Sequence, residues 1–241
     1  MAERPVAVVT GTSRDVGKYV ALGLGQAGWS ILGLYRNPQH ESDQEGIIRR
    51  VRAFKGGVKM SVLGANLLDE NTPDLIEEAR EINVFAQLRL VDKLIDNLAV
   101  GGKIVYLNSY PAHRFGLSQE FKRELLGDYI NTAQSHFEGE QALRSRIPEF
   151  TERDIRLAIV VGNGLDGTFV TRLLKLGNKE FVSQMLSFSE LGYFPTVMDM
   201  ATSVVKVIRG NYPTGRTEYV GLARRYQLYP SRPLGLELFG G

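Results

Sequence analysis

Cysteine is absent from the 241-residue sequence, and histidine occurs only three times. The absence of cysteine excludes disulfides, thiolate metal sites and a cysteine nucleophile, and it agrees with a reducing compartment. The histidines, His40, His113 and His136, are far apart in the sequence and form no HExxH or similar spacing. We therefore expect no metal site.

Long hydrophobic runs and an excess of one charge sign are also missing. No apolar run reaches the roughly 18 residues that a membrane span requires, and MAERPVAVVTG at the start has no apolar core behind a basic head. Lys and Arg total 29 against 27 for Asp and Glu, so the net charge of +2 favours neither nucleic acid nor an anionic membrane as a partner. We expect a cytoplasmic protein with a small-molecule substrate, and a length that fits one domain, 1–241.

Short runs rich in Val, Ile and Leu alternate with longer stretches of helical periodicity. Strands are expected at 5–11, 30–36, 59–66, 103–109, 156–162 and 217–221. Helices are expected at 16–27, 43–54, 72–99, 118–145, 168–175, 178–187 and 197–209. The strand segments carry few charges, as strands covered on both faces do. The alternation predicts an α/β fold with a mostly parallel sheet and helices on both faces.

The stretch VVTGTSRDVGKYVALGLGQAGW, 8–29, leads from an apolar strand through a glycine-containing turn into a helix. Gly11 would permit the tight turn and Gly17 the close packing of strand and helix, while the helix N-terminus would present N–H groups to a diphosphate. An acid at the end of the second strand would bind the ribose of NAD, whereas a cation would accept the extra phosphate of NADP. Arg36 lies there and Arg14 lies in the turn, so these residues predict NADP.

The segments TGTSRDVG (10–17) and LYRN (34–37) resemble the short-chain dehydrogenase/reductase family, whose opening motif is TGxxxGxG. Similar segments follow at 82–98, 101–109, 129–147 and 160–168, so the resemblance covers most of the chain. It implies a Rossmann-type, doubly wound fold and NADPH-dependent reduction of a small-molecule carbonyl.

The resemblance also implies roles for individual residues. Ser109 would orient the substrate carbonyl, Tyr129 would donate the proton, and Asn83 would hold a water of the proton relay. Together with the residues of the turn, the implied cofactor contacts are Gly11, Ser13, Arg14, Val16, Gly17, Arg36, Asn66 and Thr168.

Three features depart from the family pattern. Asp15 replaces the middle glycine of the opening motif, and Ala133 stands where the family has the lysine that stabilises tyrosinate. Lys122, His136 or the nicotinamide charge are the alternatives for that cation. Residues 67–82 are too few for the helix, strand and loop that the family has there, so we expect about six strands with the fourth one missing. The first strand would then pair directly with 103–109, or side chains would fill the gap.

These departures leave a second function open. The chain would be a non-redox protein of the same fold, either a cyclase, lyase or isomerase of a biosynthetic pathway or a binding or regulatory protein. Tyr129, Tyr110, Ser109 and His113 would then line the pocket, and NADP would be structural or absent. In either case the resemblance implies a homodimer or homotetramer formed through the helices at 72–99 and 118–145.

Overall fold

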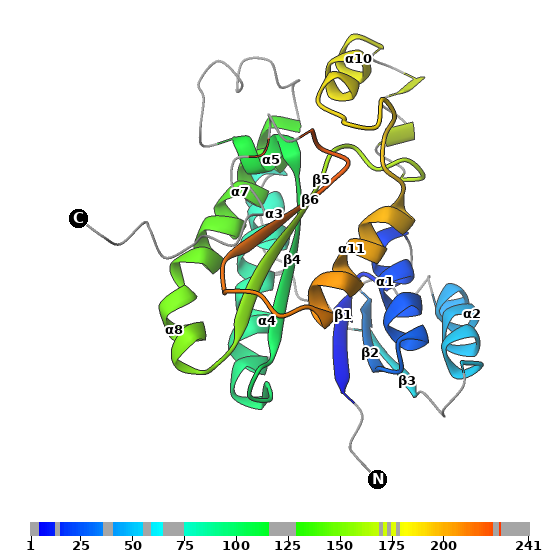
Figure 1. The fold of residues 1–241 in the computed structure, drawn as a ribbon, viewed down its shortest axis with the longest axis vertical. Coiled ribbons are helices and arrows are strands. Elements are labelled where there is room, and N and C mark those ends of the chain that lie inside the picture. The colour runs from blue at the N-terminus through cyan, green and yellow to red at the C-terminus, as the bar shows by residue number, and fades with distance from the viewer. Residues whose placement is uncertain are drawn as a thin grey trace.

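The computed structural model describes residues 5–12, 15–35, 41–54, 59–64, 75–115, 129–168, 171–172, 175–176, 179–223 and 227. These residues form six strands with helices on both faces (Figure 1). The strands are β1 (Val6–Thr10), β2 (Ser30–Tyr35), β3 (Met60–Gly64), β4 (Lys103–Ser109), β5 (Arg156–Gly162) and β6 (Arg216–Val220). All six were expected from the apolar runs, with bounds that differ by at most two residues at either end.

The helices are also close to their expected positions. They are α1 (Asp15–Gln26), α2 (Glu41–Arg52), α3 (Leu75–Arg80), η2 (Glu81–Phe85), α4 (Ala86–Leu94), η3 (Ile95–Asn97), α5 (Tyr110–Arg114), α7 (Tyr129–Ser145), α8 (Ile147–Glu152), α10 (Lys179–Ser187) and α11 (Val197–Arg209). The short helices α5 and α8 were not expected. Much of the helix predicted at 168–175, and residues 118–128 of the one predicted at 118–145, lie outside the described residues.

The strands form two parallel sheets, ordered β1-β2-β3 and β4-β5-β6. No ladder between β1 and β4 is present among the described residues, and residues 75–102 contain no strand. The expected six-stranded fold is therefore confirmed for this part of the chain. Direct pairing of the first strand with 103–109, one of the two arrangements considered, is not what these residues adopt.

Side chains connect the two sheets instead. Val9 of β1 belongs to the same buried cluster as Ala158 and Val160 of β5, and Val105 and Leu107 of β4 pack against it. Leu157 through Val161 are fully buried, which explains why β5 is a continuous apolar run and not an alternating one. The second expected arrangement, a gap filled by side chains, is the one found.

Helices cover both faces of the sheets (Figure 1). Helices α1, α2 and α11 lie on one face, where Gly23 of α1 allows Val205 of α11 to come as near as 3.0 Å to the position of a Cβ atom. Helices α3, α4 and α7 lie on the other face together with η2. None of the helices in the described ranges has the length and apolar character needed to cross a membrane.

The single long helix predicted at 72–99 is present from Leu75 to Asn97, but it is not a regular α-helix. Five residues in its middle, Glu81–Phe85, form a π-helix, and its last turn, Ile95–Asn97, is a 3-10 helix. A π-helical turn is wider than an α-helical one and is frequent at functional sites. Asn83, one of the predicted site residues, lies in this turn.

Candidate functional site

The candidate site lies where the strand order reverses. The chain runs outward from β1 to β3 in one sheet and from β4 to β6 in the other, so β1 and β4 face each other at a switch point (Figure 1). Open α/β sheets bind ligands at such a point, outside the carboxyl ends of the strands. Gly11 follows β1, Ser109 ends β4 and Thr168 follows β5, so three of the predicted residues lie at this edge.

The turn between β1 and α1 has the close approach that was predicted for it. Gly11 has φ +65°, in the left-handed region that favours glycine. A Cβ atom at Gly17 would lie 2.2 Å from the carbonyl oxygen of Gly11 and 2.8 Å from that of Thr10. The buried Thr12 ties the turn to β2, because its N–H donates to the Leu34 carbonyl oxygen at 3.3 Å. Val16 is partly buried and packs against the hydrophobic cluster that contains Val9.

Asp15 is the first residue of α1 and has φ +48°, a strained value for a residue other than glycine. Because α1 begins at Asp15, this negatively charged residue lies at the helix N-terminus, the end at which a diphosphate would bind. The other predicted cofactor contacts near this turn, Ser13, Arg14, Arg36 and Asn66, lie outside the described residues.

Ser109 ends β4 and is at the same time the N-cap of α5. Its Oγ accepts the Ala112 N–H at 3.4 Å, and its own N–H donates to Asn108 Oδ1 at 2.8 Å. The sequence SYPA favours a helix here because Pro111 is tolerated in the first turn. The strand end and the start of α5 together hold Ser109 in place.

Asn83 contacts α7 through both its side chain and its backbone. Its Nδ2 donates to Ser135 Oγ at 2.9 Å, and its carbonyl oxygen accepts the Tyr106 hydroxyl at 3.3 Å. Helix α7 comes close because a Cβ at Gly139 would lie 2.2 Å from that same carbonyl oxygen. The π-helical turn, Gly139 and Tyr106 therefore define where Asn83 lies.

Tyr129 is the first residue of α7, and its side chain is outside what the structure describes. Ala133, at the position of the family's lysine, is fully buried in an apolar cluster with Phe115 and Phe194. Burial lowers the pKa of His136 to about 4, so this imidazole is neutral at pH 7. His136 therefore supplies no positive charge in place of the missing lysine, and Lys122 lies outside the described residues.

Thr168 lies in the loop after β5, as predicted. Its Oγ1 is 2.9 Å from the Leu165 carbonyl oxygen and 3.0 Å from Thr171 Oγ1, and it accepts the Thr171 N–H at 3.3 Å. These contacts make Thr168 part of a local turn. The structure places Thr168, Ser109 and Gly11 at one edge of the sheets, while Asn83 is held against α7.

A buried polar network lies beside Ser109, and sequence reasoning missed most of it. The fully buried Glu140 accepts hydrogen bonds from Asn108 Nδ2 at 2.6 Å, His113 Nδ1 at 2.7 Å and Arg144 Nε at 2.7 Å. Burial alone would raise the pKa of Glu140, but the hydrogen bonds and charges of His113 and Arg144 outweigh it and lower that pKa. Glu140 is therefore a buried carboxylate.

The network extends to β6 on its far side. Arg144 donates to the Gly215 carbonyl oxygen at 2.9 Å and to Thr217 Oγ1 at 2.7 Å, and His113 Nε2 is 3.0 Å from the Tyr219 hydroxyl. The spacing of Glu140 and Arg144 on one helix was the only local signal for any of this. Tyr110, considered as a pocket residue, is instead a fully buried core residue whose hydroxyl accepts from Arg114 Nη1 at 2.8 Å.

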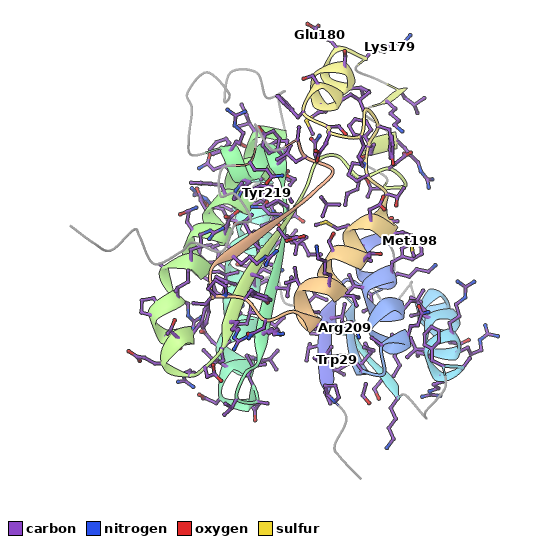
Figure 2. The ribbon with its side chains drawn as sticks, in the orientation of Figure 1. Trp29, Lys179, Glu180, Met198, Arg209 and Tyr219 are labelled. Atoms are coloured by element: carbon purple, nitrogen blue, oxygen red, sulfur yellow. The ribbon has the colours of Figure 1, made fainter. Side chains whose placement is uncertain are left out.

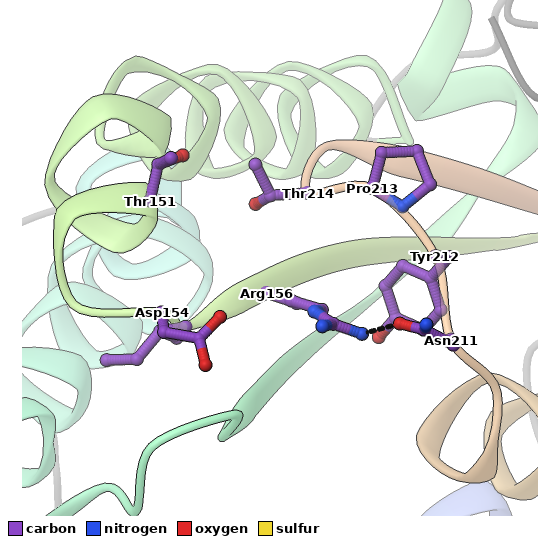
Figure 3. A pocket seen from close by; sticks show the side chains of 8 residues that line it. Thr151, Asp154, Arg156, Asn211, Tyr212, Pro213 and Thr214 are labelled. Atoms are coloured by element: carbon purple, nitrogen blue, oxygen red, sulfur yellow. Dashed lines mark hydrogen bonds between the residues drawn. The ribbon is translucent and has the colours of Figure 1, made fainter.

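A separate pocket of about 370 Å³ lies at the opposite edge of the sheet, near the amino end of β5 (Figure 3). It is lined by Thr151, Asp154, Ile155, Arg156, Asn211, Tyr212, Pro213 and Thr214, and Arg156 Nη1 donates to Asn211 Oδ1. Because parallel sheets place their ligands at the carboxyl ends of the strands, this pocket is not part of the candidate site.

Tyr212 beside this pocket leads to a prediction about stability. Its hydroxyl is buried and has no hydrogen-bond partner among the described residues, and burial raises its pKa to about 12. Tyr212→Phe removes an unsatisfied buried polar group, so we expect the free energy of unfolding to rise by about 1 kcal/mol in urea denaturation. The matched variant Tyr106→Phe, which loses the hydrogen bond to the Asn83 carbonyl oxygen, should be less stable than the wild type. A loss of stability in Tyr212→Phe would contradict the prediction.

No protein-family model matches the sequence. Solved structures do match over nearly their whole length. A blue fluorescent protein from a metagenomic library, solved with NADPH, is 20% identical, with a TM-score of 0.75 over 91% of this chain and 98% of that one. L-sorbose reductase from Gluconobacter frateurii, solved with NADPH and L-sorbose, is 17% identical, with a TM-score of 0.69 over 90% of this chain and 95% of that one.

A third similar structure is LugOII, a promiscuous reductase that catalyses keto-reduction at C1 during lugdunomycin biosynthesis. It is 16% identical, with a TM-score of 0.69 over 89% of this chain and 95% of that one. At these identities the likeness establishes the fold and not the activity. The protein thus has the Rossmann-type α/β fold that these three structures share.

Proposed function

We propose that this protein is an NADPH-dependent reductase that acts on the carbonyl group of a small molecule. The observation that carries the proposal is the turn between β1 and α1. Gly17 has no room for a Cβ because the backbone of Gly11 lies against it, and this closeness brings the N-terminus of α1 to the end of β1. Backbone N–H groups at a helix N-terminus bind phosphate, so the turn fits a dinucleotide diphosphate.

The choice of NADP over NAD rests on Arg14 and Arg36. In the sequence Arg14 lies in the turn after β1 and Arg36 follows β2, and their guanidinium groups would pair with the phosphate on the adenosine ribose. No acid accompanies Arg36 in the segment LYRN, so nothing there would favour the ribose hydroxyl of NAD. When bound, NADPH would supply the hydride.

Ser109 has the role of binding the substrate oxygen in this proposal. Its Oγ accepts the Ala112 N–H at 3.4 Å, so the oxygen is positioned before any substrate binds and its own hydrogen can be donated to the substrate. A donor that is already oriented stabilises the negative charge that develops on a carbonyl oxygen as hydride is added to the carbon. Asn83 would act further back, where its amide hydrogen bond to Ser135 steadies the packing of α7.

The second candidate function is a non-redox protein of the same fold. It is favoured by the surroundings of Ala133, where an apolar cluster occupies the position of the family's lysine, and by the neutral state of His136. A phenol has a pKa of about 10, so Tyr129 without a cationic neighbour is a weak proton donor near pH 7.

Calorimetric titration with NADPH and NADH, followed by NADPH absorbance over a panel of ketones and aldehydes, separates the candidates. The proposal expects NADPH to bind at least about tenfold more tightly than NADH, which corresponds to about 1.4 kcal/mol, and expects one or more carbonyls to be reduced. Tight binding of NADPH without turnover would favour the non-redox alternative. If neither nucleotide changes the melting temperature or the fluorescence of Trp29, the reductase proposal fails.

A further inference from the structure

A chain of three side chains leads from the buried network to the edge of the sheet. Tyr219 lies on β6 (Figure 2) and is partly exposed. Its hydroxyl is 3.0 Å from His113 Nε2, and the two rings pack edge to face. His113 Nδ1 is 2.7 Å from Glu140 Oε2, and both of these side chains are 1% exposed. A reactive hydroxyl, an imidazole and a carboxylate in this order form the arrangement that activates a side chain for proton transfer.

The hydrogen bonds define the direction of the chain. Glu140 is a carboxylate and only accepts, so Nδ1 of His113 must carry the hydrogen of the 2.7 Å bond. The other ring nitrogen, Nε2, then faces Tyr219. It accepts the phenolic hydrogen when the ring is neutral and donates to the phenolic oxygen when the ring is protonated.

The pairing of Glu140 with Arg144 does not by itself explain His113. Arg144 already provides a charged partner for Glu140 at 2.7 Å, and Asn108 fills a further acceptor position. A buried imidazole whose second nitrogen reaches a partly exposed phenol adds a route for protons between the interior and the surface.

The route ends on the same row of the sheet as Asn108, the residue before Ser109. Tyr219 pairs with Val161 of β5, and Val161 pairs with Asn108 of β4. Neighbouring strands are about 4.8 Å apart, so the backbones of Tyr219 and Asn108 lie about 10 Å apart on one row of the sheet. Asn108 precedes Ser109 and accepts its N–H. The relay and the proposed carbonyl-binding serine therefore share one network.

We propose that Tyr219 is the acid–base residue of this site, with His113 relaying its proton and Glu140 holding the imidazole. The inference rests on the proposed reductase function and replaces Tyr129 as the source of the proton. Tyr219 Oη–H gives its hydrogen to the substrate oxygen that becomes the alcohol. The phenolate then takes the hydrogen from Nε2 of protonated His113. Because the ring itself is buried, it recovers one proton from solvent water by way of the partly exposed Tyr219 hydroxyl.

Nitrogen NMR on protein labelled with 15N-histidine tests the relay without any turnover. With only three histidines in the chain, single substitutions at His40 and His136 assign the signals of His113. We expect a protonated Nδ1 and an Nε2 signal that moves by several ppm or more in Tyr219→Phe, while the Nδ1 signal keeps its protonated shift. Tyr212→Phe, a matched change at the opposite edge of the sheet, should leave both nitrogens unchanged. An unchanged chemical shift of His113 Nε2 in Tyr219→Phe would overturn the relay.

Kinetics then test the catalytic role with any carbonyl that the wild-type protein reduces. Loss of a general acid typically costs about 100-fold or more, so we expect kcat of Tyr219→Phe to fall by that factor while its affinity for NADPH changes by less than about twofold. Tyr212→Phe should keep the wild-type kcat. This control shows whether the loss of kcat is specific to the Tyr219 hydroxyl or follows from removing any buried tyrosine hydroxyl. Wild-type kcat in Tyr219→Phe would overturn the acid–base role. If the wild-type protein reduces no carbonyl, the reductase proposal fails, and the NMR result alone decides the relay.

Discussion

Replacing Gly17 with alanine is expected to weaken NADPH binding by about 100-fold or more and to lower stability by about 1–3 kcal/mol. The added methyl group would lie 2.2 Å from the Gly11 carbonyl oxygen. Its other contacts shorter than 3 Å are also with backbone atoms, of Gly11 and Thr10, so no side-chain movement can relieve the clash. The turn must open, which separates the N-terminus of α1 from the end of β1. Overpacking of a close backbone contact costs stability in this range.

The matched control is Gly46→Ala. Gly46 lies in the interior of α2, and a Cβ there would meet nothing within 4 Å. Alanine is preferred over glycine inside helices, so this variant should be more stable by about 0.5–1 kcal/mol and should bind NADPH as the wild type does. Calorimetric titration and urea denaturation of both variants measure the two effects separately. Wild-type affinity and stability in Gly17→Ala would contradict the close approach on which the proposed cofactor site depends.

The second large effect is expected at Glu140. Replacing it with alanine should lower the free energy of unfolding by about 3–5 kcal/mol, because breaking a buried ion pair on one side leaves the other charge without compensation. Arg144 would lose its 2.7 Å partner, and the donors on Asn108 and His113 would lose their shared acceptor. The loss would also release the strand end that precedes Ser109, so we expect activity to fall together with stability.

Glu149 provides the control for this substitution. Glu149 also forms ion pairs with arginines, with Arg146 at 2.8 Å and Arg153 at 3.9 Å, but its side chain is 37% exposed. Exposed ion pairs contribute little, so Glu149→Ala should cost less than about 1 kcal/mol. Equal losses for the two variants in urea denaturation would show that Glu140 is not the centre of a buried network.

Glu140 also makes stability depend on pH in a defined window. Its pKa is lowered below the ordinary value of 4.5 in the folded state, so its contribution to stability is fully present above that pH. The contribution is lost as the pH falls below 4.5 towards the folded pKa, where the folded protein also takes up the proton. Glu140→Ala should accordingly show a smaller decrease of stability than the wild type over this acid range.

Local pattern in the sequence predicted the strands and the first turn well. The apolar runs KIVYLNS and RLAIVVG coincide with β4 and β5. In β5 the run is continuous because a strand buried on both faces needs apolar residues at successive positions. The glycine spacing of the opening stretch predicted the contact between Gly11 and Gly17, since both a tight turn and a close helix need residues without a side chain. The shortness of 67–82 predicted that no strand lies there, and its described part, residues 75–82, contains none.

Other features had no local signature. Residues in the long helix at Glu81–Phe85 follow the same apolar periodicity as their neighbours, yet they form a π-helix where α7 packs against them through Gly139. Ala133 and His136 belong to one helix, but their surroundings depend on tertiary packing. Packing places Ala133 in an apolar cluster and buries His136, whose imidazole is therefore neutral. Burial, and not residue type, excludes His136 as the missing cation.

The sequence by itself determined the α/β order of elements, the glycine turn and the absence of a lysine after Tyr129, because each of these depends on neighbours within a few residues. Only the tertiary structure decided that β1 and β4 remain unpaired in the described part of the chain and that Glu140 collects donors from three elements. The contact between His113 and Tyr219 joins residues 106 positions apart. Such a pairing depends on how the sheet and the helices pack, and no spacing along the chain encodes it.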